Sequence, residues 1–509
     1  MSAPPAPCVM VQGTGSGVGK SVLAAALCRL FARAGYRVAP FKSQNMSLNS
    51  AVTADGGEIG RAQAAQAEAA GVTATVDMNP ILMKPETDGR AQLVVRGAAT
   101  GSVTFREYMA MKTEMLAVVE ASLARVRAAH DLVVIEGAGS PAEVNLADTE
   151  IVNMRVARLA HAPVVLVGDI DRGGVFAALV GTLALLDAED RARVAGFVVN
   201  KFRGDPSLLR PGFDVLTART GVPVLGVVPY FSERLVPAED SLDIAADAGV
   251  ATADATTLDA AVIRLPHVAN FDDVEPLAAE PAVRVRFVTS PAALADADLV
   301  VVPGSKTTVA DLEWLRDRGF ARALADAVRG GRPLLGLCGG YQMLGIAIRD
   351  PDGVESSLAE TPGLGLLPGI TTFTRPKRTV RVRARVSARH GLFAAAAGVE
   401  FDAYEIHAGR TDVGASLQPF ALAAGAVGEG AMSASGRVVG TYLHGLLADG
   451  RLRRALLTAV AEAAGKPVHA AWGAGAASAS RYDRLADIVG GAIDMPAVAK
   501  LVGLPYPRG

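Results

Sequence analysis

The stretch that decides the fold of the first half is "VMVQGTGSGVGKSVLAAALCRLFARAGY", residues 9–36. An apolar run, a glycine-rich turn and an Ala/Leu-rich run follow one another, which predicts a strand, a loop and a helix. The usual phosphate loop has a glycine five residues before its Gly-Lys-Ser, where this chain has Thr14. The pattern is therefore a longer variant, and its glycines are Gly13, Gly15, Gly17 and Gly19.

Such a loop is suited to a nucleoside triphosphate. Backbone N–H groups and the helix N-terminus hold the phosphates, Lys20 reaches the terminal phosphates, and the hydroxyl of Ser21 can ligate Mg²⁺. The alternative is a glycine-rich turn with an incidental lysine, and the complete order of strand, loop, Gly-Lys-Ser and helix argues against it. The predicted nucleotide contacts in this loop are Gly13, Thr14, Gly15, Gly17, Val18, Gly19, Lys20 and Ser21.

Short Val/Ile/Leu-rich runs alternate with Ala-rich helical stretches along most of the chain, as in "DLVVIEG", "PVVLVGD" and "DLVVVPG". Continuous apolar strands between helices indicate parallel sheets covered on both faces. We expect an α/β protein with two doubly wound, mainly parallel sheet domains and a helical tail. The Arg/Val alternation in "TVRVRARVSA" predicts one half-exposed antiparallel strand. The expected units are a phosphate-loop domain (1–235), a linker (236–258), a second domain (259–450) and a helical C-terminal extension (451–509).

The bulk composition excludes several classes of function. The 509 residues carry a net charge of −2, so nothing suggests a nucleic-acid surface or an anionic membrane partner. The three cysteines lie far apart without CxxC spacing, which argues against a disulfide framework or zinc site and favours a reducing, cytoplasmic compartment. The apolar stretch "GGVFAALVGTLALLDAED" is too short to span a bilayer and predicts a buried helix.

Polar residues at two further strand ends extend the nucleotide site. In "HDLVVIEGAGSPAEVNL" a buried strand delivers Glu136 to its carboxyl end, where a doubly wound sheet presents ligands, and this carboxylate could hold Mg²⁺. The alternative is a strand-end acid satisfied by solvent. The loop "GTGSGVGKS" resembles that of dethiobiotin synthetase, a family that activates a carboxylate as an acyl phosphate. By that resemblance Asn200, at the end of "VAGFVVNK" beside Lys201, would read the adenine.

In the second half, "RPLLGLCGGYQMLG" places Cys338 at the tip of a strand before two glycines. A strand–Cys–Gly–Gly–helix turn is the cysteine form of a nucleophile elbow. A nucleophilic cysteine needs a base and an oxyanion hole, and His444 in "VVGTYLHGLL" is the candidate base. The candidate oxyanion donors are Gly304, Ser305 and Gly339. The alternative is a core cysteine that packs as a small hydrophobe.

Together with Gln342 in "CGGYQMLG", these residues resemble a class I, triad-type glutamine amidotransferase. That superfamily usually has a glutamate two residues after the histidine to orient it, and here the position is Leu446. Either His444 is held another way, or glutaminase activity depends on the other domain. The same departure marks the cobyrinic/cobyric acid branch of the superfamily.

The chain as a whole resembles the family of glutamine-hydrolysing adenosylcobyric acid synthases of cobalamin biosynthesis. The stretches that match are "FKSQNMSLNS", "DGGEIGRAQAAQA", "MNPILMKP", "EGAGSPAEVNL", "DIDRGGVFA", "VNKFRGD", "RLPHVANFDD", "VVPGSKTTVADLEWLR", "CGGYQMLG" and "YEIHAGRT". The resemblance implies an ATP-dependent carbon–nitrogen ligase that amidates the b, d, e and g carboxylates of adenosylcobyrinic acid a,c-diamide. Its partners would be the corrinoid polycarboxylate, glutamine and ATP, with Mg²⁺ and with no nucleic acid or membrane, and it could form a homo-oligomer.

The resemblance also assigns residues. Lys42, Gln44 and Asn45, just after the strand "YRVAPF", would line the nucleotide and substrate pocket. Glu58 is a candidate second magnesium carboxylate, with a solvated loop acid as the alternative. His407 is a rival for the catalytic base, but His444 follows its strand directly and matches the family pattern.

Two other functions compete with this interpretation. Cobyrinic acid a,c-diamide synthase shares both domains, but it should carry a Gly-Pro-Asp run where this chain has "SQNMSLNS" after Lys42. A partition-type ATPase switch should carry a second lysine early in the loop, and "GTGSGVGK" has none before Lys20. A glutaminase half would also be useless to such a switch.

Overall fold

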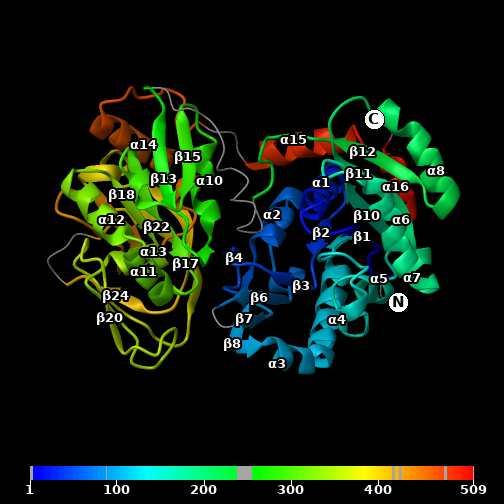
Figure 1. Ribbon diagram of the computed structural model, residues 1–509, viewed down its shortest axis with the longest axis horizontal. Coiled ribbons are helices and arrows are strands. Elements are labelled where there is room, and N and C mark those ends of the chain that lie inside the picture. The colour runs from blue at the N-terminus through cyan, green and yellow to red at the C-terminus, as the bar shows by residue number, and fades with distance from the viewer. Residues whose placement is uncertain are drawn as a thin grey trace.

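The computed structural model describes residues 4–86, 89–237, 255–414, 419–423, 427–474 and 478–507, which form two lobes (Figure 1). The first lobe is built on a six-stranded sheet in the order β12-β11-β10-β1-β9-β2, with every neighbouring pair parallel. Its strands are β1 (Cys8–Gly13), β2 (Val38–Phe41), β9 (Leu132–Glu136), β10 (Val164–Asp169), β11 (Val194–Phe202) and β12 (Val224–Pro229). The predicted α/β fold is confirmed.

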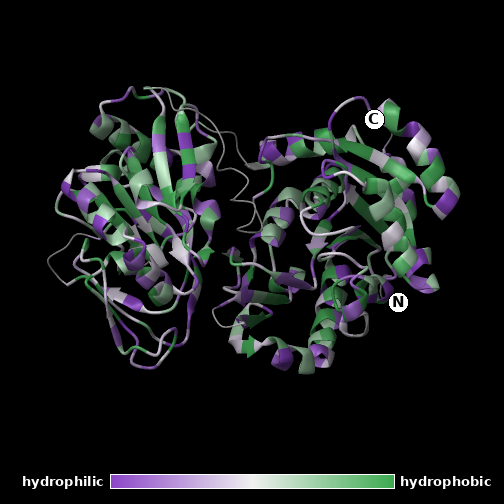
Figure 2. Ribbon diagram, viewed as in Figure 1, coloured by the Kyte–Doolittle hydropathy of each residue, from purple (hydrophilic) through white to green (hydrophobic). Residues whose placement is uncertain are grey.

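Helices cover both faces of this sheet because successive strand residues point to opposite sides and both sides are apolar. Val9 and Val11 pack with α1, whereas Met10 packs with the helices of the other face. Figure 2 shows hydrophobic residues concentrated in the central strands of both lobes. The helices are α1 (Lys20–Arg33), α2 (Arg61–Ala70), α3 (Phe105–Ala110), α4 (Lys112–Ala129), α5 (Met154–Ala160), α6 (Val175–Leu185), α7 (Ala188–Arg193) and α8 (Arg210–Thr220).

The predicted buried helix is α6, but only one of its faces is covered: Leu179 is fully buried and Leu185 is exposed. No helix among the described segments is both long and apolar enough to cross a membrane.

An excursion between β2 and α4 carries additional short strands on the side that faces the second lobe (Figure 1). Four of them form a small sheet in the order β3-β6-β7-β8, and two form the pair β4-β5. The strands are β3 (Gln44–Met46), β4 (Ser50–Val52), β5 (Glu58–Gly60), β6 (Ile81–Pro85), β7 (Arg90–Val95) and β8 (Ala98–Thr104).

The second lobe has a six-stranded sheet in the order β15-β13-β16-β18-β28-β27, parallel except for β27. Its strands are β13 (Leu258–Ile263), β15 (Val283–Val288), β16 (Leu299–Val302), β18 (Leu334–Leu337), β27 (Ala431–Met432) and β28 (Val438–Thr441). Its helices are α10 (Glu275–Ala278), α11 (Thr308–Asp317), α12 (Phe320–Arg329), α13 (Gly339–Leu344) and α14 (Gly450–Ala464).

Shorter strands flank this sheet. The Arg/Val alternation forms β22 (Arg378–Val386), which pairs antiparallel with β23 (Glu400–His407), as predicted. The other strands are β14 (Val268–Ala269), β17 (Gly304–Ser305), β19 (Ala347–Arg349), β20 (Glu360–Pro362), β21 (Ile370–Thr372), β24 (Arg410–Asp412), β25 (Ala421–Ala423) and β26 (Val427–Glu429).

The C-terminal segment is helical, as predicted, but it is not a separate unit. Helix α14 packs into the second lobe, whereas α15 (Ser478–Gly490) and α16 (Met495–Leu501) cross back to the apolar cluster of the first lobe, where α15 packs on α1 (Figure 1). Arg29 and Arg33 of α1 form ion pairs with Asp483 at 2.8 Å and Asp487 at 2.6 Å. Most of the predicted linker, residues 238–254, lies outside the described residues.

Candidate functional site

The glycine-rich loop between β1 and α1 is shaped by close backbone contacts. Gly17 and Gly19 adopt φ angles of 71° and 102°, in the left-handed region that favours glycine. A Cβ on Gly19 would also lie 2.0 Å from the side-chain nitrogen of Asn200. Lys20 folds back over the loop, and its Nζ donates to the carbonyls of Gly15 at 2.8 Å and Gly139 at 2.9 Å. Its ammonium group thus lies beside the backbone that would surround phosphates.

Asn200, at the end of β11, lies against this loop. Its amide nitrogen donates to the carbonyl of Val18 at 2.8 Å. Lys201 donates to the carbonyl of Gly17 at 2.7 Å and pairs with Asp169 at 2.8 Å. The β11 strand end that was predicted to extend the nucleotide site therefore lies against the phosphate loop.

Glu136 is the centre of a buried polar cluster next to the loop. Its Oε1 accepts from the hydroxyl of Ser21 at 2.8 Å and pairs with Nζ of Lys42 at 2.9 Å. Its Oε2 accepts from the side-chain amide of Gln66 on α2 at 2.5 Å. The Glu136 side chain is 0% exposed. Because side chains from three separate segments meet at this carboxylate, its position is fixed.

The donor set of this cluster fits Mg²⁺. The hydroxyl of Ser21 and the carboxylate of Glu136 are hard oxygen ligands that already lie in contact. Mg²⁺ in nucleotide sites takes one or two such protein ligands and fills its octahedron with phosphate oxygens and water. No group of three or more His, Cys, Asp or Glu that could hold a metal ion occurs among the described residues.

Gln44 and Asn45 on β3 have partners on helices α3 and α2 instead. The carbonyl oxygen of Gln44 accepts from the hydroxyl of Tyr108, and the amide of Asn45 donates to Gln63 at 3.0 Å. Of the three residues predicted from "FKSQN", Lys42 is thus the one whose described contacts reach the Glu136 cluster.

Glu58, predicted as a second magnesium ligand, lies between two lysines in the structure. Its Oε1 pairs with Lys84 at 2.7 Å and its Oε2 pairs with Lys377 of the second lobe at 2.8 Å. Burial opposes the charged form, but Lys377 and Lys84 outweigh it and lower the pKa of Glu58. Burial also lowers the pKa of Lys84 to about 8. Both carboxylate oxygens are occupied by ammonium groups, so we replace the metal assignment with an ion-pair role between the lobes.

Cys338 follows β18 and precedes α13, in a strand–turn–helix arrangement. Its φ of 49° and ψ of −108° are strained for a non-glycine residue, as at a nucleophile elbow. The two glycines after it permit close packing: a Cβ on Gly340 would lie 2.0 Å from the Val302 carbonyl oxygen, and one on Gly339 would lie 2.8 Å from the Ser305 backbone nitrogen. The thiol lies 3.5 Å from the carbonyl oxygen of Ile406.

His444 lies beside this thiol and is oriented by an acid that the sequence did not reveal. Its Nδ1 lies 2.6 Å from Oδ2 of Asp273, and Oδ1 of Asp273 accepts from the backbone N–H of Gly445 at 2.8 Å. Burial opposes the imidazolium, but Asp273 and Cys338 outweigh it and raise the pKa of His444 to about 10. Its Nε2 is buried without a hydrogen-bond partner among the described residues.

Asp273 thus occupies the position of the missing orienting acid, while Leu446, where the superfamily has glutamate, is fully buried. Asp273 lies in a 3₁₀ turn, Phe271–Val274, which ends the matching stretch "RLPHVANFDD". The stretch was recognised by resemblance, but nothing in its pattern connects it with a histidine 171 residues away.

His407 is held differently. Its Nδ1 contacts the carbonyl oxygen of Gly409 at 3.0 Å, its Nε2 contacts Glu405 at 3.0 Å, and its ring stacks on Tyr442 at 3.7 Å. Both ring nitrogens already have partners, which supports His444 as the base.

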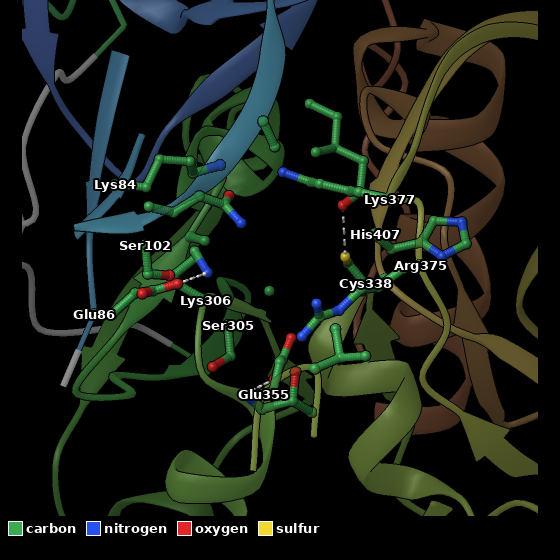
Figure 3. A pocket seen from close by; sticks show the side chains of 18 of the residues that line it. Lys84, Glu86, Ser102, Ser305, Lys306, Cys338, Glu355, Arg375, Lys377 and His407 are labelled. Carbon is green, nitrogen blue, oxygen red and sulfur yellow. Dashed lines mark hydrogen bonds and ion pairs between the residues drawn. The ribbon is translucent and has the colours of Figure 1, made fainter. Parts of the chain in front are cut away.

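The thiol opens into a cavity of about 600 Å³ between the lobes (Figure 3). The second lobe contributes Gly304, Ser305, Cys338, Gln342 and His444, and the first lobe contributes Lys84, Glu86, Arg90 and Ser102. Gln342 is fixed by hydrogen bonds from its amide to the carbonyl of Ala408 at 2.9 Å and to the hydroxyl of Tyr442 at 3.2 Å. Residues of the first lobe therefore line the same cavity as the site predicted in the second lobe.

Comparison with known proteins matches each lobe to a known domain family. Residues 9–241 match a CobQ/CobB/MinD/ParA nucleotide binding domain, and residues 259–452 match a CobB/CobQ-like glutamine amidotransferase domain. A cobyric acid synthase of Sorangium cellulosum is 55% identical over 97% of this chain and 98% of its own length. The chain belongs to the cobyric acid synthase family. Family members from Geobacillus thermodenitrificans and Rhodococcus jostii are 50% and 49% identical, over 94% and 98% of this chain and 94% and 96% of their own lengths.

Proposed function

We propose that this member of the cobyric acid synthase family amidates the b, d, e and g carboxylates of adenosylcobyrinic acid a,c-diamide, using ATP and glutamine. The observation that carries the proposal is the presence of two chemically distinct sites in one chain. A Cys338–His444–Asp273 arrangement lies at a cavity lined by both lobes, and a phosphate loop with Lys20 and Glu136 lies in the other lobe. The first arrangement suits release of ammonia from glutamine, and the second suits activation of a carboxylate.

In the proposed glutaminase reaction, the thiolate of Cys338 attacks the side-chain amide carbon of glutamine. The positive charge of His444, which Asp273 stabilises, holds the thiolate, and Nε2 gives its proton to the departing nitrogen so that ammonia leaves. Backbone N–H groups at Ser305 and Gly339, which pack against each other beside Cys338, are the proposed oxyanion donors. Water then hydrolyses the thioester to glutamate.

In the proposed synthetase reaction, a corrinoid carboxylate attacks the γ-phosphorus of ATP to give an acyl phosphate and ADP. Ammonia displaces phosphate from this intermediate and forms the amide. Lys20 stabilises charge on the transferring phosphoryl group, because positioning and electrostatics dominate such transfers. Bound Mg²⁺, held by Ser21 and Glu136, would neutralise phosphate charge, and Asn200 would read the adenine.

We further propose domain limits of 1–235 and 259–450 with a linker at 236–258, and we assign the C-terminal helices to the two lobes as their packing indicates. We also propose a reducing, cytoplasmic setting. All three cysteines are free and buried, and the proposed mechanism needs Cys338 as a thiol.

The test is an incubation of the protein with ATP, Mg²⁺, glutamine and adenosylcobyrinic acid a,c-diamide, followed by mass spectrometry to count the amides added. Four added amides are expected. Cys338→Ala should give no product from glutamine but should give product from ammonium salts, increasingly as pH rises and more free NH₃ is present. A Cys338→Ala variant that still uses glutamine would overturn the nucleophile assignment, and a count other than four would overturn the substrate assignment.

A further inference from the structure

The turn that carries Asp273 is held by the first lobe. Just before the turn, Oδ1 of Asn270 accepts from the backbone N–H of Ser50 at 3.1 Å. Within it, the backbone N–H of Phe271 donates to Oδ1 of Asn49 at 3.3 Å. The residue beside Asp273 is Asp272, whose Oδ2 pairs with Nε of Arg61 at 2.7 Å. Three successive residues of this turn region therefore depend on the first lobe for a polar partner.

Tyr404, which also contacts the imidazole of His444, is held by the same segment of the first lobe. The ring of Tyr404 stacks on His444 at 5.2 Å, and the backbones of these two residues exchange hydrogen bonds of 3.2 and 2.9 Å. The hydroxyl of Tyr404 reaches the carbonyl oxygen of Ser50 at 3.5 Å. The acid and the aromatic ring that fix the orientation of His444 thus both rest on residues 49–61 of the first lobe.

Arg61 is itself held in place. It is the first residue of α2, and in the same helix Gln66 donates to the buried Glu136 beside the phosphate loop. Its guanidinium is partly buried, at 23% exposure, and Asp272 is at 8%. A charge pair shielded from water in this way keeps its geometry far better than an exposed one, because solvent screens it less.

We propose that Arg61 is a positioning residue for glutamine hydrolysis, acting from the first lobe through Asp272 on the turn that presents Asp273 to His444. The proposal rests on the glutaminase function proposed above. The proposal explains why Leu446 can replace the glutamate that usually orients the histidine. Here the orienting acid lies not on the segment of His444 but on a turn at the boundary between the lobes. The imidazole is then correctly aligned only when the first lobe is docked.

The experiment compares Arg61→Met with Arg381→Met in the full-length chain. Methionine keeps much of the aliphatic stem and removes the guanidinium. Arg381 is the matched control because it joins the lobes at the same segment, through a 3.0 Å hydrogen bond from its Nε to the carbonyl of Val52, but makes no ion pair with the Asp273 turn. It therefore separates loss of the Asp272 ion pair from loss of any contact between the lobes. Glutamate release is measured as kcat and KM over a range of pH, and amidation from ammonium salts is measured in parallel.

Arg61→Met should lower kcat for glutamine hydrolysis about tenfold or more, since a small displacement of a catalytic group is enough for such a loss. The KM for glutamine should change little. The alkaline limb of the kcat profile should move to lower pH, because a displaced Asp273 no longer raises the pKa of His444. Arg61→Lys, which can still pair with Asp272, should recover part of the loss, and Arg381→Met should lower kcat much less than Arg61→Met does.

Amidation from ammonium salts reports whether the first lobe of the variant is folded, and it should be unchanged in Arg61→Met. Equal glutamine kinetics in Arg61→Met and Arg381→Met would overturn the proposal. So would a parallel loss of both nitrogen sources, which would mean that Arg61 only stabilises the first lobe. Failure of the proposed function would instead appear as glutamine use by Cys338→Ala, so the two failures are distinguishable.

Discussion

Replacing Asp273 with asparagine tests the geometry of the glutaminase site most directly. The carboxylate accepts two short hydrogen bonds, from Nδ1 of His444 at 2.6 Å and from the backbone N–H of Gly445 at 2.8 Å. Asparagine keeps the shape and removes the charge. A hydrogen bond to a charged group contributes about 1.5–3 kcal/mol. At about 1.4 kcal/mol per factor of ten, losing it should slow glutamine hydrolysis about 10- to 150-fold.

A larger loss, up to about 10⁴-fold, is expected if the amide nitrogen turns toward Nδ1 and fixes the wrong tautomer of the ring. The direction in which the pH profile should shift follows from the pKa of His444. Asp273 helps to raise the pKa of His444 to about 10, which keeps the imidazolium protonated into the alkaline range. A neutral asparagine removes that support, so the pKa falls and the alkaline limb of activity moves to lower pH.

The assay measures glutamate release by Asp273→Asn over a range of pH. Cys338→Ala gives the background rate without the nucleophile, and ammonium-dependent amidation checks that the synthetase site is intact. Ammonium-dependent amidation should be unchanged, because Asp273 lies in the second lobe and the phosphate loop lies in the first. Glutamine hydrolysis within twofold of the unmodified rate, or an unshifted alkaline limb, would show that Asp273 does not orient His444.

Three further substitutions address the first lobe. Lys20→Ala should abolish amidation from both glutamine and ammonium salts, because the acyl phosphate no longer forms; near-normal turnover with ammonium in a product assay would refute the phosphate-loop assignment. Glu136→Gln should slow both reactions less severely and raise the Mg²⁺ concentration needed for half-maximal rate, whereas an unchanged Mg²⁺ titration would remove Glu136 from the metal site. Glu58→Gln should leave the Mg²⁺ requirement unchanged but destabilise the folded chain by about 3 kcal/mol, because Lys84 and Lys377 lose a buried counter-ion. Denaturant unfolding measures this loss, and a raised Mg²⁺ requirement would return Glu58 to the metal site.

The sequence was sufficient where structure depends on neighbours in the chain. The phosphate loop and the elbow at Cys338 each consist of a strand, a glycine turn and a helix within a few residues, so their spacing predicts their shape. Strand ends were also predictable, because the carboxyl ends of parallel strands meet at one edge of a sheet. Glu136 therefore lies beside Ser21, as expected from two separate segments.

The sequence was insufficient where a side chain is fixed by a partner far along the chain. Glu58 lies in a stretch, "DGGEIG", that was expected to be a loop but contains the buried strand β5, and only the fold brings Lys377, 319 residues away, against it. The role of Asp273 could not be predicted either, because a short 3₁₀ turn has no periodic sequence pattern. The C-terminal segment was recognised as helical from its composition, but its apolar stripe does not specify which lobe it covers.

The return of α15 and α16 to the first lobe has a consequence for how the chain is made. Residues such as Leu485 and Val489 share an apolar cluster with Leu27 and Phe31 of α1, so the first lobe cannot close this face until the last segment has been synthesised. About 240 residues separate Val236 from the start of α15. At ribosomal rates of about 5–20 residues per second, the outer face of α1 stays uncovered for on the order of ten to fifty seconds after Val236 has been added. The second lobe has been synthesised before α15 appears. The lobe that is synthesised first is therefore the last to finish folding.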